Sequence, residues 1–221
     1  MLAAILLREH PGTTIVTDSL TSTGLAKFIE EKGGVHHRFK RGYRNVINES
    51  IRLNNLGQDS QLAIETSGHG AFKENYFLDD GAYIVTKLLI ELARGKKEGY
   101  TLESMIATLE EPAESVEFRM NIKLDDFKPY GQQVIDELTA YAATKEGWSL
   151  APSNFEGVRV NLDEAHGNGW FLLRLSLHDP LLPLNIESNS QGGAKKIAEE
   201  LAGFIKGYDK LDAAKFLAYA E

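Results

Sequence analysis

The sequence predicts an α/β protein made of two domains, and three observations indicate this. The 221-residue chain has 43% apolar and 25% charged residues, a globular composition with enough apolar side chains to form packed cores. Over residues 1–110, strand-like and helix-like runs alternate, which predicts a three-layer α/β domain with a short mixed sheet between helices. Over residues 115–221, grouped strands are flanked by helices, which is typical of a smaller α+β domain with an antiparallel sheet. Residues 111–114, which include Pro112, are the expected linker.

The elements of the first half follow from caps, breakers and apolar spacing. Thr21 or Ser22 can cap a helix, and Gly33-Gly34 can stop it, because these residue types satisfy or release the backbone at helix ends. The expected helices cover residues 2–7, 22–33, 45–56, 79–95 and 102–109, and the expected strands cover residues 13–17, 35–39 and 62–64. We expect buried apolar residues at Val46, Ile47 and Ile51 in the third helix and at Ile84, Val85, Leu88, Leu89 and Leu92 in the fourth.

The second half has a different order of elements. The expected strands cover residues 116–122, 158–162, 170–175 and 182–186, and the expected helices cover residues 132–145 and 193–206. Trp148 and Trp170 are large enough to anchor the core of this domain.

Charge and composition exclude several classes of protein. The balance of 24 basic and 32 acidic residues gives a net charge of −8, which argues against a nucleic-acid partner and against an anionic membrane surface. No apolar run approaches the length of a membrane span, and the chain has no cysteine. We therefore expect a soluble, cytoplasmic protein without disulfides. His36 and His37 point to opposite faces of a strand, so they do not predict a metal site.

The densest polar cluster follows the strand over residues 62–64. Glu65-Thr66-Ser67-Gly68-His69 places a carboxylate, a hydroxyl and an imidazole in five residues, and Gly68 allows a sharp turn and a close approach of the backbone to a ligand. Such a loop suits hydrogen bonding to a polyhydroxylated molecule. The alternative is a turn whose polar side chains only satisfy backbone groups. A Ser/His/acid hydrolase site is a further alternative, although no G-x-S-x-G nucleophile elbow is present.

Several motifs in the first half resemble the α-D-phosphohexomutase family, which includes phosphomannomutases and phosphoglucomutases. The Glu65–His69 string, followed by Asp79-Asp80-Gly81 at the start of a long helix, is similar to the family's sugar-binding loop. The segments Ile15–Ser19, Thr21–Leu25 and Arg41–Arg44 occur in the order of the family's third domain. The resemblance implies that Glu65 and Ser67 bind sugar hydroxyls and that His69 lies beside them. Lys40, Arg41 and Arg44 form either a solvated basic face or a surface that attracts phosphate.

The second half resembles the family's fourth domain. Glu156–Val160, Gly169-Trp170 and the run from Arg174-Leu175-Ser176 to Glu187 follow its layout, and the resemblance implies that Arg174 and Ser176 bind the substrate's phosphate. A guanidinium offers paired donors to phosphate oxygens, and His178 could add another donor when protonated. Leu177, His178 and Asp179 depart from the small polar residues usual after that serine. Pro183 and Asn185 stand where family members often have an arginine.

Two family motifs are missing from the sequence. Neither the serine loop of the first domain nor the Asp-x-Asp-x-Asp-Arg magnesium loop of the second occurs in these residues. The resemblance therefore implies a C-terminal half, domains 3 and 4, of an isomerase that interconverts hexose 1-phosphate and hexose 6-phosphate through a bisphosphorylated sugar. On this interpretation the partners are a hexose phosphate and the missing N-terminal domains, which bind Mg²⁺ in the parent enzyme. A hexose bisphosphate is the activator, and no metal ligand or catalytic residue is expected in the chain itself.

The isolated half is expected to be inactive, because phosphoryl transfer needs a phosphoryl carrier and a cation that offsets charge.

Two other functions compete with this interpretation. A stand-alone, non-catalytic module that binds a sugar phosphate is the first alternative. A small hydrolase that uses Ser67 is the second.

Overall fold

A computed structural model of the protein describes residues 1–221, which form two compact units, Met1–Glu111 and Pro112–Glu221. The helices of the first unit are α1 (Leu2–Glu9), α2 (Thr23–Glu31), α3 (Tyr43–Asn55), η1 (Lys73–Asn75, a 3₁₀ turn), α4 (Gly81–Glu98) and α5 (Leu102–Met105). Its strands are β1 (Thr14–Thr17), β2 (Val35–Arg38), β3 (Ser60–Ile64) and β4 (Gly70–Phe72).

The first unit contains a four-stranded mixed sheet in the order β2-β1-β3-β4. Strands β2, β1 and β3 are parallel, and Thr17 pairs with Arg38 on one side and with Ile64 on the other. Their carboxyl ends therefore meet at one edge. Strand β4 returns antiparallel to β3, with Leu62 opposite Phe72. Sequence analysis missed β4 because its three residues are too few to show a period.

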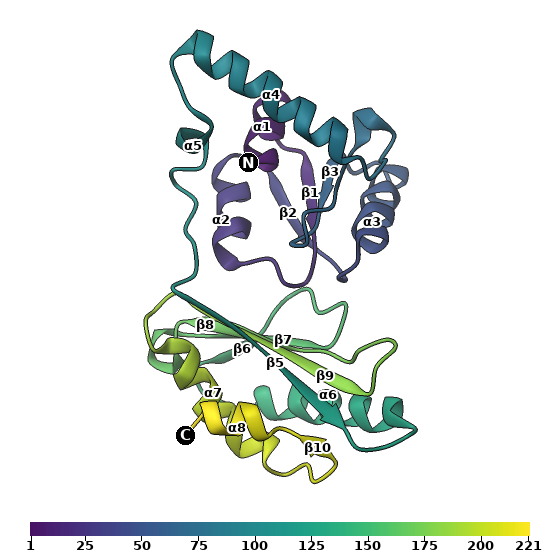
Figure 1. The fold of residues 1–221 in the computed structure, drawn as a ribbon, viewed down its shortest axis with the longest axis vertical. Helices are drawn as coiled ribbons and strands as arrows, with labels where there is room; N and C mark the ends of the chain where they lie inside the picture. Colours follow the sequence, from purple (N-terminus) through teal and green to yellow (C-terminus); the bar gives the residue numbers. More distant parts are fainter. The chain divides into compact units, whose positions relative to one another are not determined.

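Helices cover both faces of this sheet (Figure 1). Ile15, Leu62 and Phe72 pack against α1 and α2 on one face, with Ile84 of α4 at the edge of that cluster. Val16 and Ala63 pack against α3 on the other face, because neighbouring strand residues point to opposite sides. The expected three-layer α/β domain with a short mixed sheet is confirmed.

Helix ends follow local chemistry. Ser22 caps α2, since its Oγ accepts a hydrogen bond from the Leu25 N–H at 3.1 Å. Asp80 caps α4 by accepting from the Ala82 and Tyr83 N–H groups at 3.0 and 3.1 Å. Gly95 does not end α4, which continues to Glu98; a Cβ at Gly95 would lie 2.6 Å from the Tyr100 carbonyl oxygen, so glycine is needed there for packing.

The predicted burial of α4 is wrong in part. Ile84 and Leu88 are half-buried, but Val85, Leu89 and Leu92 are 54%, 59% and 52% exposed. The helix turns its charged side toward the domain, and spacing alone does not indicate which side of an amphipathic helix faces inward. Two smaller predictions also fail, because Ile51 is 36% exposed on α3 and α5 covers only four residues of the range 102–109.

The second unit has a six-stranded antiparallel sheet in the order β10-β5-β9-β8-β7-β6. Its strands are β5 (Glu114–Ile122), β6 (Trp148–Leu150), β7 (Val158–Leu162), β8 (Gly169–Leu173), β9 (Leu181–Ser188) and β10 (Leu211–Asp212). Its helices are α6 (Phe127–Ala142), η2 (Glu164–His166, a 3₁₀ turn), α7 (Gly193–Ile205) and α8 (Ala214–Tyr219). The expected antiparallel sheet flanked by helices is confirmed, with β6, β10 and α8 as elements that sequence analysis did not predict.

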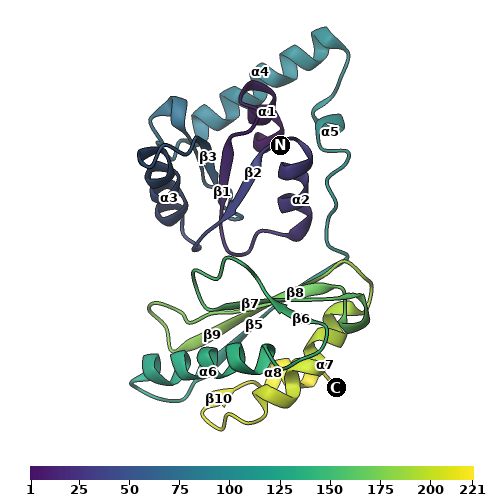
Figure 2. The ribbon, with the colours of Figure 1, turned by 180° about the vertical axis from the view of Figure 1, so that it is seen from behind.

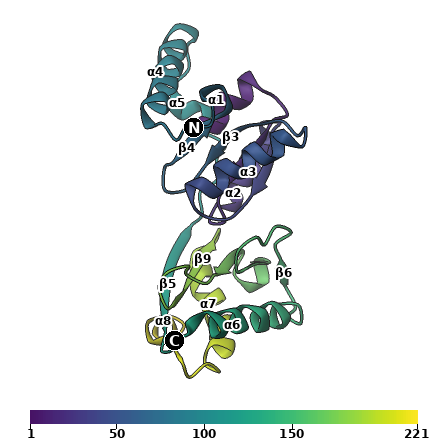
Figure 3. The same ribbon diagram turned by 90° about the vertical axis from the view of Figure 1, so that its right-hand side faces the viewer.

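Helices α6, α7 and α8 lie along one face of this sheet (Figures 2 and 3), and the core of the unit lies between them and the strands. Trp148 belongs to this core and packs edge-on against Phe171, with ring centroids 5.2 Å apart. Trp170 is also buried but lies on the opposite face of the sheet, because it is adjacent to Phe171 in β8. The Arg159 guanidinium lies 3.5 Å from the centre of the Trp170 ring. None of the helices combines the length and apolarity that crossing a bilayer requires.

Candidate functional site

Three loops meet at the carboxyl edge of the parallel strands in the first unit. They follow β1, β2 and β3 and carry Asp18, Gly42 and Glu65. The chain passes from β1 to β2 on one side and then crosses to β3 on the other, so the strand order reverses beside β1. In open α/β sheets, ligands bind outside the carboxyl ends of the strands at such a reversal.

Asp18 joins two of these loops. Its buried carboxylate accepts hydrogen bonds through Oδ1 from the Leu20 N–H (3.1 Å) and the Thr21 hydroxyl (3.3 Å). Through Oδ2 it accepts from both the N–H and the hydroxyl of Thr66, at 3.1 and 2.6 Å. Sequence analysis gave Asp18 no separate role; its position directly after a buried strand was the available signal.

Glu65 joins the loop after β3, in which it lies, to the loop after β2. Its Oε1 accepts a hydrogen bond from the Gly42 N–H at 2.9 Å, and the Arg41 Nε lies 3.9 Å from the same oxygen. Its Oε2 accepts from the Ser67 hydroxyl at 2.7 Å. A carboxylate has about four acceptor positions, and these two hydrogen bonds use half of them on a side chain that is only 6% exposed. Gly42 has a φ of +111°, a conformation that favours glycine.

The segment Glu65–His69 is the turn of the β3–β4 hairpin. The Glu65 N–H donates to the His69 carbonyl and the Gly68 N–H donates to the Glu65 carbonyl, both at 2.9 Å. Gly68 has a φ of +95°, as expected for the last residue of a three-residue hairpin loop. The hairpin therefore fixes the spacing of the three predicted sugar-binding residues, Glu65, Ser67 and His69.

His69 is held by two neighbours that sequence analysis did not assign to it. Its Nδ1 lies 2.6 Å from Asp79 Oδ2, and its ring stacks on Tyr43 with centroids 4.9 Å apart. When Nδ1 donates to Asp79, Nε2 is the atom left for a ligand. The exposed side chain keeps that atom accessible, since His69 is 46% exposed.

The hydrogen bonds of this loop do not form a hydrolase relay. Ser67 donates to Glu65 and His69 pairs with Asp79, so the serine and the histidine have separate acidic partners. A nucleophilic serine needs the imidazole as its own base. The geometry instead presents an acceptor, a hydroxyl and a ring nitrogen, which suits the binding of hydroxyl groups.

The second unit brings the predicted phosphate-binding residues together in the loop between β8 and β9. The Arg174 N–H donates to the Pro183 carbonyl and the Ser176 N–H donates to the Leu181 carbonyl, both at 3.1 Å, so the base of the loop extends the strand ladder. Ser176 Oγ accepts from the Asp179 N–H at 3.2 Å and keeps its own proton for donation. His178 and Asp179 lie exposed at the tip.

An acidic and a basic residue next to this loop escaped sequence analysis. Glu117 lies opposite Asn185, and Arg119 lies opposite Pro183, so the two share the face of the sheet opposite the helices. Arg119 donates to Glu117 at 2.7 Å, which lowers the pKa of that carboxyl; a hydrogen bond from Asn185 at 3.2 Å and the charge of Arg174 act in the same direction. Cross-strand pairing was needed to find them.

A pocket of about 420 Å³ opens beside Ser176. Lys128 and Gln132 of α6 contribute to its wall, and Glu156 contributes an acidic group. Lys128 is a second cation beside the loop that sequence analysis did not single out.

The titratable residues of the chain do not fit a resident metal ion. No group of three or more His, Asp or Glu side chains is arranged to hold one.

The first unit defines a class: a mixed α/β domain with a polar hairpin turn at the carboxyl edge of its sheet. The family model described as "Phosphoglucomutase/phosphomannomutase, alpha/beta/alpha domain III" matches residues 1–111. The chain belongs to the phosphoglucomutase/phosphomannomutase family, and the resemblance stated from the motifs is confirmed.

Curated relatives agree over nearly the whole chain. A phosphoglucomutase of Neisseria meningitidis is 28% identical over 212 residues, which cover 96% of this chain and 42% of that protein. A phosphomannomutase/phosphoglucomutase of Pseudomonas syringae pv. tomato is 30% identical over 199 residues, covering 89% and 38%. The crystal structure of a phosphoglucomutase/phosphomannomutase family protein from Burkholderia thailandensis superposes with a TM-score of 0.72 at 26% identity, covering 93% of this chain and 40% of that one. The chain thus spans about 40% of the length of these relatives.

Proposed function

We propose that this chain is the substrate-positioning, C-terminal part of a phosphohexomutase that interconverts hexose 1-phosphate and hexose 6-phosphate through a bisphosphorylated sugar. The first unit corresponds to the third domain of the enzyme, and the second unit to the fourth. The observation that carries the proposal is the Glu65–His69 hairpin turn at the sheet's carboxyl edge, in a chain whose relatives are named as hexose phosphate mutases.

The hairpin turn binds the hydroxyl groups of the sugar. Glu65 accepts hydrogen bonds from ring hydroxyls, Ser67 donates or accepts, and the Nε2 atom of His69 supplies a further contact. Binding through a carboxylate and a hydroxyl tolerates the sugar in two orientations, as a 1,6-transfer requires, because each group can pair with different hydroxyls. Asp18 and Asp79 are positioning residues, since they hold Thr66 and His69 rather than the ligand.

The β8–β9 loop binds the phosphate group of the substrate. Arg174 offers paired N–H donors, Ser176 offers its hydroxyl, and His178 donates when protonated. The loop holds the phosphate that does not react. Asp179 opposes phosphate binding, because a carboxylate repels a phosphate dianion. The affinity of this loop for phosphate is therefore moderate.

Phosphoryl transfer requires the other domains of the enzyme. A phosphoserine carries the phosphoryl group, and a Mg²⁺ ion bound outside this chain offsets its charge. A hexose bisphosphate serves as activator. The isolated chain binds sugar phosphate without turning it over.

Binding and turnover together test this function. In NMR titrations, glucose 6-phosphate and mannose 6-phosphate should bind the 221-residue chain more tightly than glucose or inorganic phosphate, because the sugar phosphates carry both the hydroxyl groups that suit the hairpin turn and the phosphate that suits the β8–β9 loop. In a coupled mutase assay with Mg²⁺ and bisphosphate, the isolated chain should be inactive. Turnover by the isolated chain, or equal affinity for sugar phosphates and inorganic phosphate, contradicts the proposal. A stand-alone module instead predicts binding but no turnover after fusion to the preceding domains of a relative.

A further inference from the structure

A pocket of about 390 Å³ opens in the first unit between α1, α4 and α5. Pockets that bind small molecules usually enclose about 300–1,000 Å³. Arg8, near the end of α1, and Lys32, directly after α2, line the pocket, and each lies shortly before a strand of the parallel sheet begins. Glu65, by contrast, follows a strand. The pocket therefore lies toward the amino edge of the sheet, and the proposed sugar site lies at the other edge.

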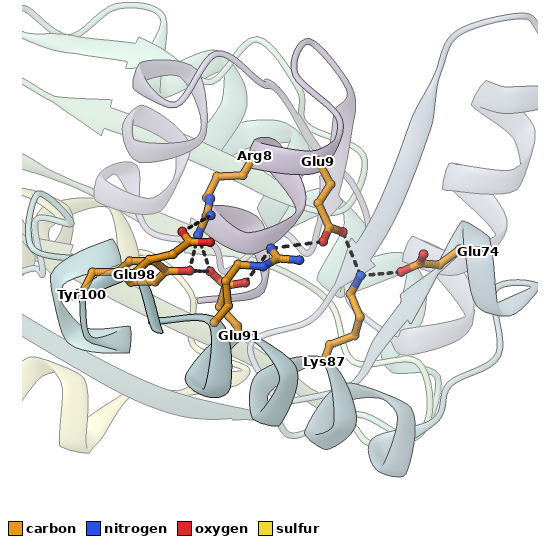
Figure 4. A network of polar contacts seen from close by, with 8 residues as sticks. Arg8, Glu9, Glu74, Lys87, Glu91, Glu98 and Tyr100 are labelled. Atoms are coloured by element: carbon orange, nitrogen blue, oxygen red, sulfur yellow. Dashed lines mark hydrogen bonds and ion pairs between the residues drawn. The ribbon is translucent and has the colours of Figure 1, made fainter. Parts of the chain in front are cut away.

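A buried carboxylate holds Arg8 in the wall of this pocket. The Arg8 Nη1 donates to Glu91, whose side chain is 1% exposed, and to the Tyr100 hydroxyl at 2.7 Å (Figure 4). The Tyr100 hydroxyl in turn donates to Glu91 at 2.6 Å. Lys87 of α4 also donates to Glu9 of α1 at 2.8 Å. Helices α1 and α4 are thus joined at two points, so this wall is formed before any ligand binds.

The rest of the Arg8 guanidinium is available to a ligand. The hydrogen bonds of its side chain leave from Nη1, and the side chain is 42% exposed. Its Nη2 lies 3.7 Å from Glu98 Oε2, which is too long for a hydrogen bond. Nε and Nη2 share one edge of the planar group and donate in parallel. This geometry suits the two oxygens of a carboxylate.

The pocket also carries a carboxylate and a second cation. Glu98, whose side chain is 51% exposed, ends α4, where the negative end of the helix dipole adds to its attraction for a cation. Lys32 is exposed, and its ammonium lies 5.3 Å from the centre of the Phe28 ring. Arg8 attracts a simple anion, but Glu98 repels it. A ligand with a carboxylate and an ammonium on neighbouring atoms suits both residues, since Arg8 and Glu98 lie 3.7 Å apart.

The remaining wall of the pocket is apolar. Ala4 is 5% exposed, and Met105 and Tyr100 are half-buried. An aliphatic side chain placed against this wall loses contact with water, which favours binding. Methionine is flexible and adapts to ligands of different shape. The wall therefore favours an apolar group next to the charged part of the ligand.

We propose that this pocket binds a free α-amino acid with an apolar side chain. The carboxylate of the amino acid accepts hydrogen bonds from Nε and Nη2 of Arg8 and is attracted by Lys32. Its ammonium donates to Glu98, and its side chain packs on the apolar wall. The site is separate from the proposed sugar site and does not rest on the proposed function.

NMR titration of the 221-residue chain with L-leucine and two analogues tests the ligand class. L-leucine should shift the backbone amide signals of Ala4, Tyr100 and Met105. 4-Methylpentanoate lacks the ammonium and 3-methylbutylamine lacks the carboxylate, so each should bind at least about fivefold more weakly than L-leucine. Absence of L-leucine binding up to about 50 mM overturns the proposal. Equal affinity for L-leucine and either analogue also overturns it.

Substitution of Glu98 tests the location of the site. Glu98→Gln should weaken L-leucine binding by about fivefold and strengthen 4-methylpentanoate binding, because it removes a partner of the ammonium and a charge that repels the carboxylate. Glu103→Gln, at an exposed position on α5, is the matched control and should change neither affinity. Equal L-leucine affinity of the wild type and Glu98→Gln overturns the proposal.

A second variant keeps the test valid if Glu98→Gln lowers the unfolding temperature. Lys32→Gln leaves α4 and the Arg8 contacts unchanged and should weaken L-leucine and 4-methylpentanoate binding alike, because both ligands lose the attraction of the ammonium. Unchanged affinity for both ligands would overturn the proposal. These readouts do not depend on mutase activity or on sugar binding.

Discussion

Asp18 accepts two hydrogen bonds from Thr66, one from its N–H and one from its hydroxyl, across 48 residues of sequence. The contact ties the end of β1 to the turn that carries Glu65 and Ser67. A buried carboxylate thus orients the polar turn without itself belonging to it.

Replacing Asp18 should destabilise the first unit. Asp18→Ala removes the acceptor for Leu20, Thr21 and Thr66 and should lower the free energy of unfolding by about 2–4 kcal/mol. Urea denaturation measures the change. Asp59→Ala, at a carboxylate 50% exposed, is the control and should cost less than about 1 kcal/mol. An unchanged midpoint for Asp18→Ala would show that the tie contributes nothing to stability.

Glu65 should contribute to sugar binding but not to phosphate binding. Glu65→Ala removes a charged acceptor of hydroxyl hydrogen bonds, so the affinity for glucose 6-phosphate should fall by about tenfold or more. Affinity for inorganic phosphate should not change, because the proposed phosphate-binding loop lies in the other unit. Glu31→Ala, on α2, is the matched control. Equal affinities of the wild-type and Glu65→Ala chains for glucose 6-phosphate would remove Glu65 from the site.

Glu117 should weaken phosphate binding by competing for Arg174. The charge of Arg174 helps to lower the pKa of Glu117, which means that the two side chains attract one another. Glu117→Gln should therefore raise phosphate affinity by about threefold to tenfold, and Arg174→Ala should reduce it by at least as much. Isothermal titration with inorganic phosphate measures both effects. Glu199→Gln, at an exposed position on α7, controls for net charge, and an equal gain there would refute the local explanation.

His166 should make stability depend on pH in the second unit. Its hydrogen bond to Asp163, at 2.6 Å, raises the pKa of His166 and lowers that of Asp163. The raised histidine pKa gives stability that is present below the unfolded value near 6.5 and is lost as the pH rises through the folded value. The lowered aspartate pKa gives stability that is present above about 4 and is lost in acid.

The expected signature is a difference in unfolding temperature between the wild type and His166→Gln that is largest between about pH 4 and pH 6.5 and shrinks above that range. Thermal unfolding followed by circular dichroism at several pH values measures it. Gln191→Asn, at an exposed position without a titratable side chain, is the control and should show no such window. A difference that stays constant from pH 5 to pH 9 would rule out the ion pair as its source.

Patterns along the sequence predicted most elements because they are local. Caps such as Ser22 and Asp80, and breakers such as Gly33-Gly34, act within a few residues of the backbone they control. The polar turn at Glu65–His69 was equally visible, since a carboxylate, a hydroxyl and an imidazole stand within five residues. Its role as a sugar-binding site remains a prediction.

Contacts between residues that are far apart in the sequence could not be predicted from such local patterns. Arg119 and Glu117 reach the phosphate loop only through the register of β5 with β9, and no spacing along the chain indicates that register. The predicted burial of α4 was wrong for a different reason. Its apolar spacing was recognised, but spacing alone does not indicate which side of the helix faces its own domain, and the contacts of Glu91 determine that side.

The hairpin that carries Glu65 and His69 also limits how this protein can evolve. Phe72 is 1% exposed and lies opposite Leu62, so adding or deleting one residue in the turn would shift β4 by one position and turn Phe72 out of the core. Substitutions of the exposed side chains in the turn should therefore be tolerated more readily than changes in its length.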